Sequence, residues 1–214
     1  MNRTPSQTEM LTALEARQGK ELVAKLQAAT VAVCGLGGLG SNVAIALARA
    51  GVGKLILIDF DVVDVTNLHR QQYKACQVGT PKPEALRDNL KEISPYVDLE
   101  THFVRITEEN VMELTRNADV VCEAFDNANA KAMLVNSILE RRPGQFLVSG
   151  SGMAGFDDAN KIKTRRVFKN FYICGDEVSD VNDGIGLVAP RVMACAAHEA
   201  LTVIRLICGL EIEN

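Results

Sequence analysis

The sequence predicts an α/β fold in which a mostly parallel sheet carries helices on both faces. Two short apolar runs, 32–35 and 55–58, lack the alternation of half-exposed strands and are typical of parallel strands covered on both sides. Helical and strand-like patterns alternate along most of the chain, which favours parallel strands joined by helices. With 214 residues, 47% of them hydrophobic, the chain can bury a large core, and we expect one domain spanning residues 1–214.

The first elements are expected to form one strand–helix–strand unit. Apolar residues recur at helical spacing over about 6–28, which predicts an N-terminal helix. The alanine-rich stretch 39–51 is the next predicted helix, with Gly51 as its C-terminal cap. Because the two apolar strands flank this helix, residues about 31–59 should form a βαβ unit with a right-handed crossover.

The remaining chain continues the same alternation. After an irregular polar segment, Pro81 and Pro83 predict the start of a helix that ends near Ile93, since proline suits a first helical turn. Further elements are expected as strands near 98–104, 119–123, 145–149 and 163–169, and as helices near 108–116 and 128–141. A glycine-containing loop over 175–186 then precedes a closing helix from Pro190.

The composition argues against several classes of protein. A net charge of −4 with interspersed signs disfavours nucleic-acid binding. The six cysteines include no CxxC pair, so neither a disulfide framework nor a zinc site is expected. The apolar tract 187–210 carries charged residues and is predicted to be a buried helix, not a membrane span. The polar start of the chain does not resemble a signal peptide, so we expect a cytoplasmic protein.

A glycine cluster follows the first predicted strand and opens the next helix. Gly35 would permit the tight turn, Gly37 and Gly38 would let a phosphate approach the backbone, and Gly40 would allow close packing of helix on strand. Free N–H groups at the helix start would face the anion. The pattern therefore predicts a Rossmann-like nucleotide site, without identifying the reaction.

Polar residues follow the second strand and a later strand. Asp59 ends the second strand, where a carboxylate binds ribose hydroxyls in such folds. Donors gathered beyond it suit a triphosphate better than the dinucleotide of a dehydrogenase. These donors are Asn67, Arg70, Gln71 and Lys82, and the carboxylate of Asp61 is expected in the same nucleotide site. Asp126, after a later strand, would line the same crevice and hold Mg²⁺ together with phosphates.

With these motifs the sequence closely resembles the ThiF/MoeB/HesA adenylyltransferases, relatives of the ubiquitin-activating enzymes. The resemblance covers nearly the whole chain, and short members that act in thiamine biosynthesis and lack zinc cysteines are the most similar. The specific segments are GLGGLGS (35–41), DFDVVDVTNLHRQ (59–71), GTPK (79–82), FDN (125–127) and GIGLVAP (184–190).

The resemblance implies an enzyme that uses ATP and Mg²⁺ to adenylylate the C-terminal glycine carboxylate of a ubiquitin-like sulfur carrier protein (ThiS-like, with a Gly-Gly tail). Arg70, Lys82 and Asp126 would be its catalytic residues, with Asp126 assisting magnesium or orienting the attacking carboxylate. Such enzymes are homodimers in which an N-terminal arginine reaches the neighbouring subunit's ATP, and Arg17 is a loose match for it. No zinc is expected.

Three other functions stay open. An NAD(P)-dependent oxidoreductase is disfavoured because none of the three tyrosines is followed by lysine four positions later. A non-catalytic protein could bind a ubiquitin-like partner without turning over ATP, or the adenylylated group could belong to a small molecule or a tRNA base. Cys174 lies where some relatives carry zinc or acceptor cysteines; we expect an ordinary loop cysteine, with sulfur transfer as the alternative.

Overall fold

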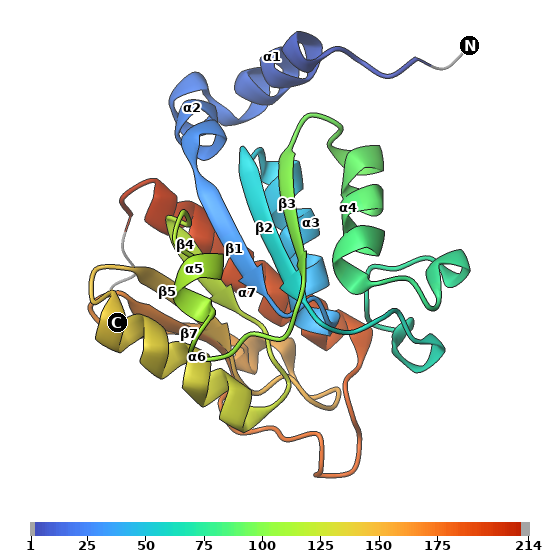
Figure 1. Cartoon of the computed structure of the whole chain (residues 1–214), viewed down its shortest axis with the longest axis vertical. Helices are drawn as coiled ribbons and strands as arrows, with labels where there is room; N and C mark the ends of the chain where they lie inside the picture. The colour runs from blue at the N-terminus through green and yellow to red at the C-terminus, as the bar shows by residue number, and fades with distance from the viewer. Residues whose placement is uncertain (1–2, 211–214) are drawn as a thin grey trace.

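The computed structural model describes residues 3–210, which contain one seven-stranded sheet flanked by helices (Figure 1). Its strand order is β3-β2-β1-β4-β5-β7-β6. Every neighbouring pair is parallel except β6 and β7. The strands are β1 Thr30–Cys34, β2 Lys54–Asp59, β3 Asp98–Phe103, β4 Val120–Glu123, β5 Phe146–Gly150, β6 Lys163–Phe168 and β7 Phe171–Gly175. The predicted α/β class is confirmed.

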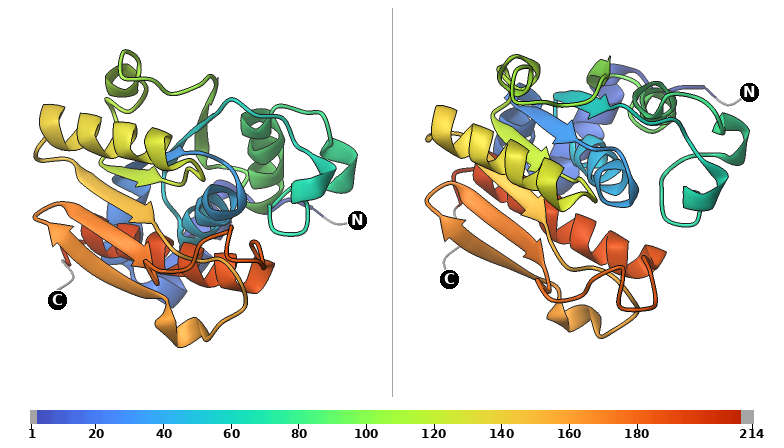
Figure 2. Two further views of the ribbon diagram at one scale, coloured as in Figure 1. Left: turned by 90° about the horizontal axis from the view of Figure 1, so that it is seen from below. Right: turned by 60° about the horizontal axis from the view of Figure 1, so that its bottom comes forward.

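The helices lie on both faces of this sheet (Figure 2). They are α1 Gln7–Gln18, α2 Lys20–Ala28, α3 Gly38–Ala50, α4 Lys82–Ile93, α5 Val111–Leu114, α6 Ala128–Arg141 and α7 Ala189–Ile207. Three short 3₁₀ turns, η1 Val65–Asn67, η2 Ala75–Gln77 and η3 Ala159–Lys161, lie in the connections. None of the helices described between residues 3 and 210 combines the length and apolarity needed to cross a membrane.

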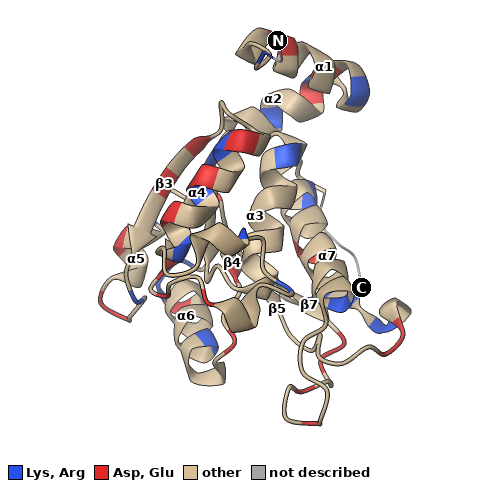
Figure 3. Cartoon of the chain, turned by 90° about the vertical axis from the view of Figure 1, so that its right-hand side faces the viewer, with Lys and Arg blue, Asp and Glu red and all other residues tan. Residues whose placement is uncertain are grey.

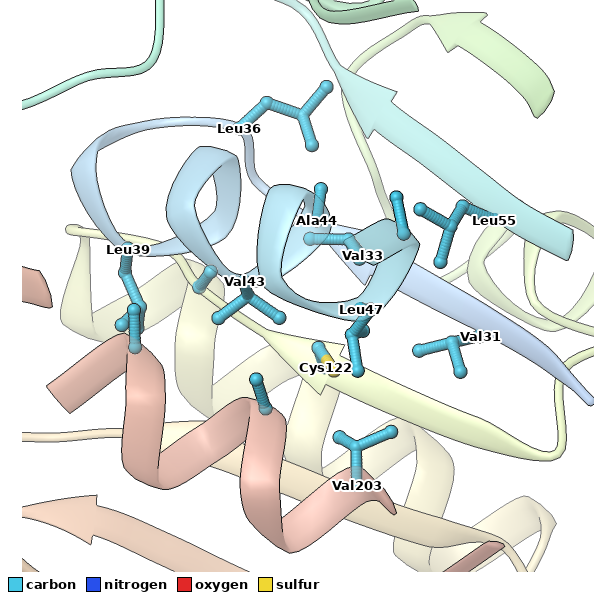
Figure 4. Close-up of a cluster of buried hydrophobic side chains, with 14 of the residues drawn as sticks. Val31, Val33, Leu36, Leu39, Val43, Ala44, Leu47, Leu55, Cys122 and Val203 are labelled. Carbon is cyan, nitrogen blue, oxygen red and sulfur yellow. The ribbon is translucent and has the colours of Figure 1, made fainter. Parts of the chain in front are cut away.

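Two apolar clusters, one on each face of the sheet, hold the layers together. Along β1, Val31 and Val33 join the first cluster, whereas Ala32 and Cys34 join the second, as the two-residue period of a strand requires. The first cluster packs α3, α4 and α7 against the sheet, and the second packs α5 and α6. Figure 4 shows α3 lying over β1, next to Val203 of α7. Covering both faces explains why the central strands are continuous apolar runs.

The prediction of a single N-terminal helix over 6–28 is wrong. Gly19 has φ +89° and divides the segment into α1 and α2. Glycine adopts this conformation without the steric cost that a Cβ brings, so the chain can change direction here. Helix α1 has no buried residue, while α2 buries Val23 and Leu26 against the body.

Strand β7 was missed by the sequence prediction, which assigned no strand between the one predicted near 163–169 and the loop over 175–186. Residues 171–175 instead turn back antiparallel to β6 and pair parallel with β5. Only two residues separate the strands, and the apolar run after Lys169 and Asn170 was the hairpin signal that the prediction overlooked. Cys174 is therefore a buried strand residue and not a loop cysteine. The predicted helix 108–116 is also reduced, to the short α5.

Arg191 fastens the loop segments that follow β5 and β7. This buried residue near the start of α7 donates through Nη1 to the carbonyl oxygens of Asp157 (2.6 Å) and Asp158 (3.0 Å). Its Nη2 donates to the Asp176 carboxylate at 2.5 Å. Burial raises the pKa of Asp176, but N–H groups of Ser179 and Val178 and the Arg191 guanidinium outweigh it and lower the pKa from 3.8 to about 2.

This ion pair predicts a pH-dependent contribution to stability. Because the folded pKa of Asp176 is lowered, its stabilisation is complete above pH 3.8 and is lost as the pH falls toward about 2. Asp176→Asn should lower the free energy of unfolding by about 3 kcal/mol at pH 7. The difference from the unmodified chain should shrink between about pH 4 and pH 2, as measured by denaturant titration. Asp88→Asn, which removes an exposed pair with Arg87, should cost less than about 1 kcal/mol. A gap that stays constant with pH would contradict this account.

Candidate functional site

The candidate site lies beside β1, where successive strands switch from being added on one side of this strand to being added on its other side. The chain adds β2 and β3 on one side of β1, and then β4 and β5 on its other side. In open parallel sheets the loops leaving the carboxyl ends of such strands diverge and leave a ligand crevice. The loops after β1, β2 and β4 meet here, and they carry most of the residues predicted from the sequence.

The glycine loop after β1 can form only with glycine at two positions. Gly35 has φ +92°, and a Cβ there would lie 2.9 Å from the carbonyl oxygen of Ala124. A Cβ on Gly40 would lie 1.9 Å from the carbonyl oxygen of Gly35, so α3 could not begin so close to β1. No side chain of the described residues caps the N-terminus of α3 at Gly37. Its first N–H groups are therefore directed toward the crevice without a capping acceptor, as an anion site requires.

Asp59 connects the end of β2 to the glycine loop. Its buried carboxylate accepts hydrogen bonds from the N–H of Leu36 (2.6 Å) and of Asp61 (2.8 Å). Burial raises the pKa of Asp59, opposed by the nearby charge of Lys82 and by these hydrogen bonds. The carboxylate thus shapes the loop, and a carboxylate has acceptor capacity for further donors.

Lys82 brings a buried cation to the same edge of the sheet. It is the first residue of α4, and its side chain is 5% exposed. Its Nζ lies 2.9 Å from the carboxylate of Asp61, which is 49% exposed. The Lys82 N–H also donates to the Asp61 carbonyl oxygen at 2.9 Å. Main chain and side chain together therefore fix the ammonium group beside Asp59 and Asp61.

The segment after η1 is anchored on the first turns of α3. The N–H of Gln72 donates to the Ser41 hydroxyl (3.1 Å), and its side-chain amide donates to Asn42 (2.7 Å). Asn42 donates in turn to the carbonyl oxygens of Gly38 and Arg70. The carbonyl oxygen of Asn67 accepts from the N–H of Arg70 and Gln71, forming the turn that carries both side chains.

Arg70 and Gln71 lie over the glycine loop with unused hydrogen-bonding capacity. The Arg70 Cγ lies 3.3 Å from the position of a Cβ on Gly38, and the Gln71 Nε2 lies 3.8 Å from that of a Cβ on Gly37. Within residues 3–210, the buried Arg70 Nε and Gln71 Oε1 have no hydrogen-bond partner. Burial lowers the pKa of Arg70, and the charge of Asp126 opposes this effect. A buried donor and acceptor without partners beside uncapped helix N–H groups fit a polar, anionic ligand.

Comparison with known proteins identifies the family. The profile described as "ThiF family" matches residues 11–214. The chain belongs to the ThiF family. Among relatives, the adenylyltransferase and sulfurtransferase MOCS3 of Aedes aegypti is 32% identical over 199 residues, which cover 86% of this chain and 43% of the relative. The corresponding UBA4 protein of Lodderomyces elongisporus is 33% identical, with coverage of 86% and 42%. The chain thus spans less than half the length of these relatives.

Solved structures show the same fold. The E. coli tRNA N6-threonylcarbamoyladenosine dehydratase TcdA, in complex with ATP, superposes with a TM-score of 0.86 and 22% identity. The alignment covers 97% of this chain and 98% of TcdA. At this identity the likeness establishes the arrangement of elements, which this ThiF-family chain shares.

Most of the site residues predicted from the sequence meet in the crevice of this ThiF-family chain. The glycine loop, Asp59, Asp61 and Lys82 lie within one network, and Arg70 and Gln71 cover the loop. Asp126 is exposed in the turn after β4, close enough for its charge to act on Arg70. No group of three or more His, Cys, Asp or Glu side chains within residues 3–210 is arranged to hold a metal ion.

Arg17 is the predicted residue that the structure separates from the others. It is exposed near the end of α1, whose Leu14 lies against Gly51 at the end of α3. The N–H of Gly53 donates to Leu26 of α2, so α1 and α2 adjoin the amino ends of the strands, opposite the crevice (Figure 1).

Sequence reasoning missed Ser41, Asn42 and Gln72 as the residues that fasten the Arg70 segment. The available signal was a pair of polar residues in the first turns of an otherwise apolar helix.

Burial raises the pKa of Cys174 to about 12. Since the thiolate is the reactive form of cysteine, we assign no sulfur transfer to this residue.

The close contact between Gly40 and Gly35 yields a direct test. Gly40→Ala should force the glycine loop away from α3 and lower the free energy of unfolding by about 1–3 kcal/mol or more. Gly144→Ala is the control, because a Cβ there meets no atom within 4 Å. Thermal and denaturant unfolding of both variants would measure the difference. Equal stability of the two variants would show that the loop is not packed as described.

Proposed function

We propose that the chain uses ATP to adenylylate the C-terminal glycine carboxylate of a small ubiquitin-like sulfur carrier protein. The observation that carries the proposal is the buried Nε of Arg70, which lies over the glycine loop. In the described part of the chain, this atom has no hydrogen-bond partner and the N–H groups at the start of α3 have no side-chain cap. Such a combination suits the phosphates of a nucleotide. The names of the MOCS3 and UBA4 relatives, which include adenylyltransferase, support the same activity.

In this proposal different crevice residues bind different parts of the nucleotide. Asp59 accepts hydrogen bonds from the ribose hydroxyls, and the glycine loop and the start of α3 bind the phosphates. The phosphate oxygens are also contacted by Asn67, Arg70, Gln71 and Lys82. A lone carboxylate near phosphates fits Mg²⁺, which commonly uses one or two carboxylates and completes its shell with phosphate oxygens and water. Asp126 would hold this ion, which would neutralise phosphate charge.

The reaction needs no nucleophile from the enzyme. A glycine carboxylate oxygen of the carrier attacks the α-phosphorus of ATP, and the bond from that phosphorus to the bridging oxygen of the β-phosphate breaks. The products are a carrier acyl-adenylate and pyrophosphate. Catalysis then consists of aligning the carboxylate with the α-phosphate and stabilising the developing charge with Arg70 and Lys82.

The partner and assembly form the second part of the proposal. Arg17 adjoins the opposite edge of the sheet in its own chain, so a second copy in a homodimer would have to supply it to the nucleotide. On the side drawn in Figure 3, acidic and basic residues are interspersed along the described helices, with no extended basic face there. This distribution, with a net charge of −4, favours a protein substrate over tRNA. We place the protein in the cytoplasm.

Loss of either crevice cation should strongly reduce turnover without unfolding the chain. Arg70→Ala and Lys82→Ala should each reduce carrier-dependent ATP–pyrophosphate exchange by about 10²–10³-fold, because each removes charge stabilisation from the transition state. Lys74→Ala removes an exposed pair with Glu92 and serves as the control, with near-normal exchange expected. Exchange would be measured with candidate carriers that end in Gly-Gly.

The same assay separates the rival functions. Near-normal exchange in both crevice variants would refute these residue assignments. ATP binding without exchange would indicate a non-catalytic protein. If AMP is transferred only when tRNA or a small molecule is present, that molecule, and not the carrier protein, is the substrate. If the chain binds NAD(P) but does not bind ATP, the oxidoreductase function would be favoured instead.

A further inference from the structure

An ion pair with a fully buried carboxylate lies beneath the turn that carries Asp126. Glu123 is the last residue of β4, and its side chain is 0% exposed. One carboxylate oxygen accepts from the Phe125 N–H at 2.7 Å. The other accepts from the Lys131 ammonium of α6 and the Ser149 hydroxyl of β5. The Lys131 Nζ also donates to the Gly150 carbonyl oxygen at 2.8 Å, so the pair joins β4, β5 and α6.

This pair fixes the Asp126 turn on both sides. Before Asp126, the Phe125 N–H is held by Glu123. After it, the Asn127 side chain caps α6 by accepting from the Ala130 N–H at 3.0 Å. The Asn127 carbonyl oxygen accepts from the Lys131 N–H at 2.9 Å, so Lys131 contacts the turn through its main chain as well. The exposed Asp126 therefore stands on a backbone with little freedom to move.

Stability alone does not account for an ion pair whose carboxylate is fully buried while the lysine side chain is 26% exposed. Replacing such a pair with apolar side chains is often neutral or stabilising, because burial of charge is costly. A second carboxylate, Glu199 of α7, is also fully buried nearby. Burial and the charge of Glu123 raise the pKa of Glu199 well above its ordinary value, and the charge of Lys131 opposes this effect. The Lys131 ammonium donates its hydrogen bond to Glu123. An apolar pair could fill the space but could not direct the Phe125 N–H.

We infer that Glu123 and Lys131 are positioning residues that hold Asp126 toward Arg70 and the reacting phosphate. The inference rests on the proposed adenylyl transfer and adds two residues that do not touch the substrates themselves. The turn lies against the glycine loop, because a Cβ on Gly35 would lie 2.9 Å from the Phe125 ring, and the charge of Asp126 acts on Arg70. A displaced turn would carry the carboxylate away from this place. Misplacement of a catalytic group by about 1 Å can cost on the order of 10²-fold in rate.

A double-mutant cycle tests this role. Lys131→Met should lower kcat for carrier-dependent exchange by on the order of 10²-fold while changing the KM for ATP little, because Lys131 does not contact the nucleotide. In an Asp126→Asn background the same change should have almost no further effect on kcat. Its effect on thermal stability should be the same in both backgrounds. Lys131→Arg should restore most of the activity, and Lys25→Met, which removes an exposed pair with Glu21 on α2, should behave like the unmodified chain.

Independent losses of kcat that multiply in the double variant would overturn the inference, as would an equal loss from Lys25→Met. A second measurement does not depend on activity: amide hydrogen exchange at Phe125 should accelerate in Lys131→Met and remain slow in Lys131→Arg. If Lys131→Met does not fold, Glu123→Gln replaces it, since its amide keeps the shape but turns a donor toward Lys131.

These outcomes distinguish the two proposals. An unmodified chain that shows no exchange with any carrier would refute the proposed function, and the catalytic role of the pair with it. If the unmodified chain is active, but Lys131→Met changes neither kcat nor the amide hydrogen exchange of Phe125, only the positioning role would be refuted.

Discussion

Helix α3 begins so close to the end of β1 that only glycine fits between them, and the rest of the crevice depends on this contact. A side-chain carbon on Gly40 would overlap the carbonyl oxygen of Gly35. The close start places the uncapped N–H groups of α3 at the edge of the sheet, where a ligand can reach them. Asp59 then fixes the intervening loop by accepting the N–H of Leu36, so the end of β2 shapes the loop that follows β1.

Around this loop the chain supports each charge through a second set of contacts. Lys82 is held by its helix start and by Asp61, and the Arg70 segment is fastened to Ser41 and Asn42 through Gln72 and the Arg70 carbonyl. Asp126 stands on a turn held by Glu123 and Lys131. Phosphate-binding groups that are fixed before the ligand arrives need little reorganisation during the reaction, which is the main source of electrostatic catalysis. The crevice thus combines rigid supports with two polar atoms, on Arg70 and Gln71, that have no hydrogen-bond partner among residues 3–210.

The sequence predicted the parts of the fold in which local pattern and tertiary context agree. Helices α3, α4 and α6 lie within a residue or two of their predicted ranges, because alanine content, Pro81 and the Asn127 cap favour helix independently of packing. The sequence prediction failed at Gly19, because a single glycine can also be tolerated within a helix. It also failed at β7, because the two-residue turn of the β6–β7 hairpin was not recognised. Cys174 was misplaced for the same reason, since its burial follows from the pairing of β7 with β5.

The family, the glycine loop and the kinds of side chain gathered after β2 could be predicted from the amino-acid sequence, since these are local motifs with fixed spacing. Which of these side chains face one another followed from the tertiary fold. Arg17 and Arg70 look alike in sequence, yet they adjoin opposite edges of the sheet. Glu123, Lys131 and Glu199 look like ordinary charged residues, yet Glu123 and Glu199 are fully buried and Lys131 is paired with Glu123. Burial and pairing depend on contacts between residues distant in sequence, which a linear pattern does not contain.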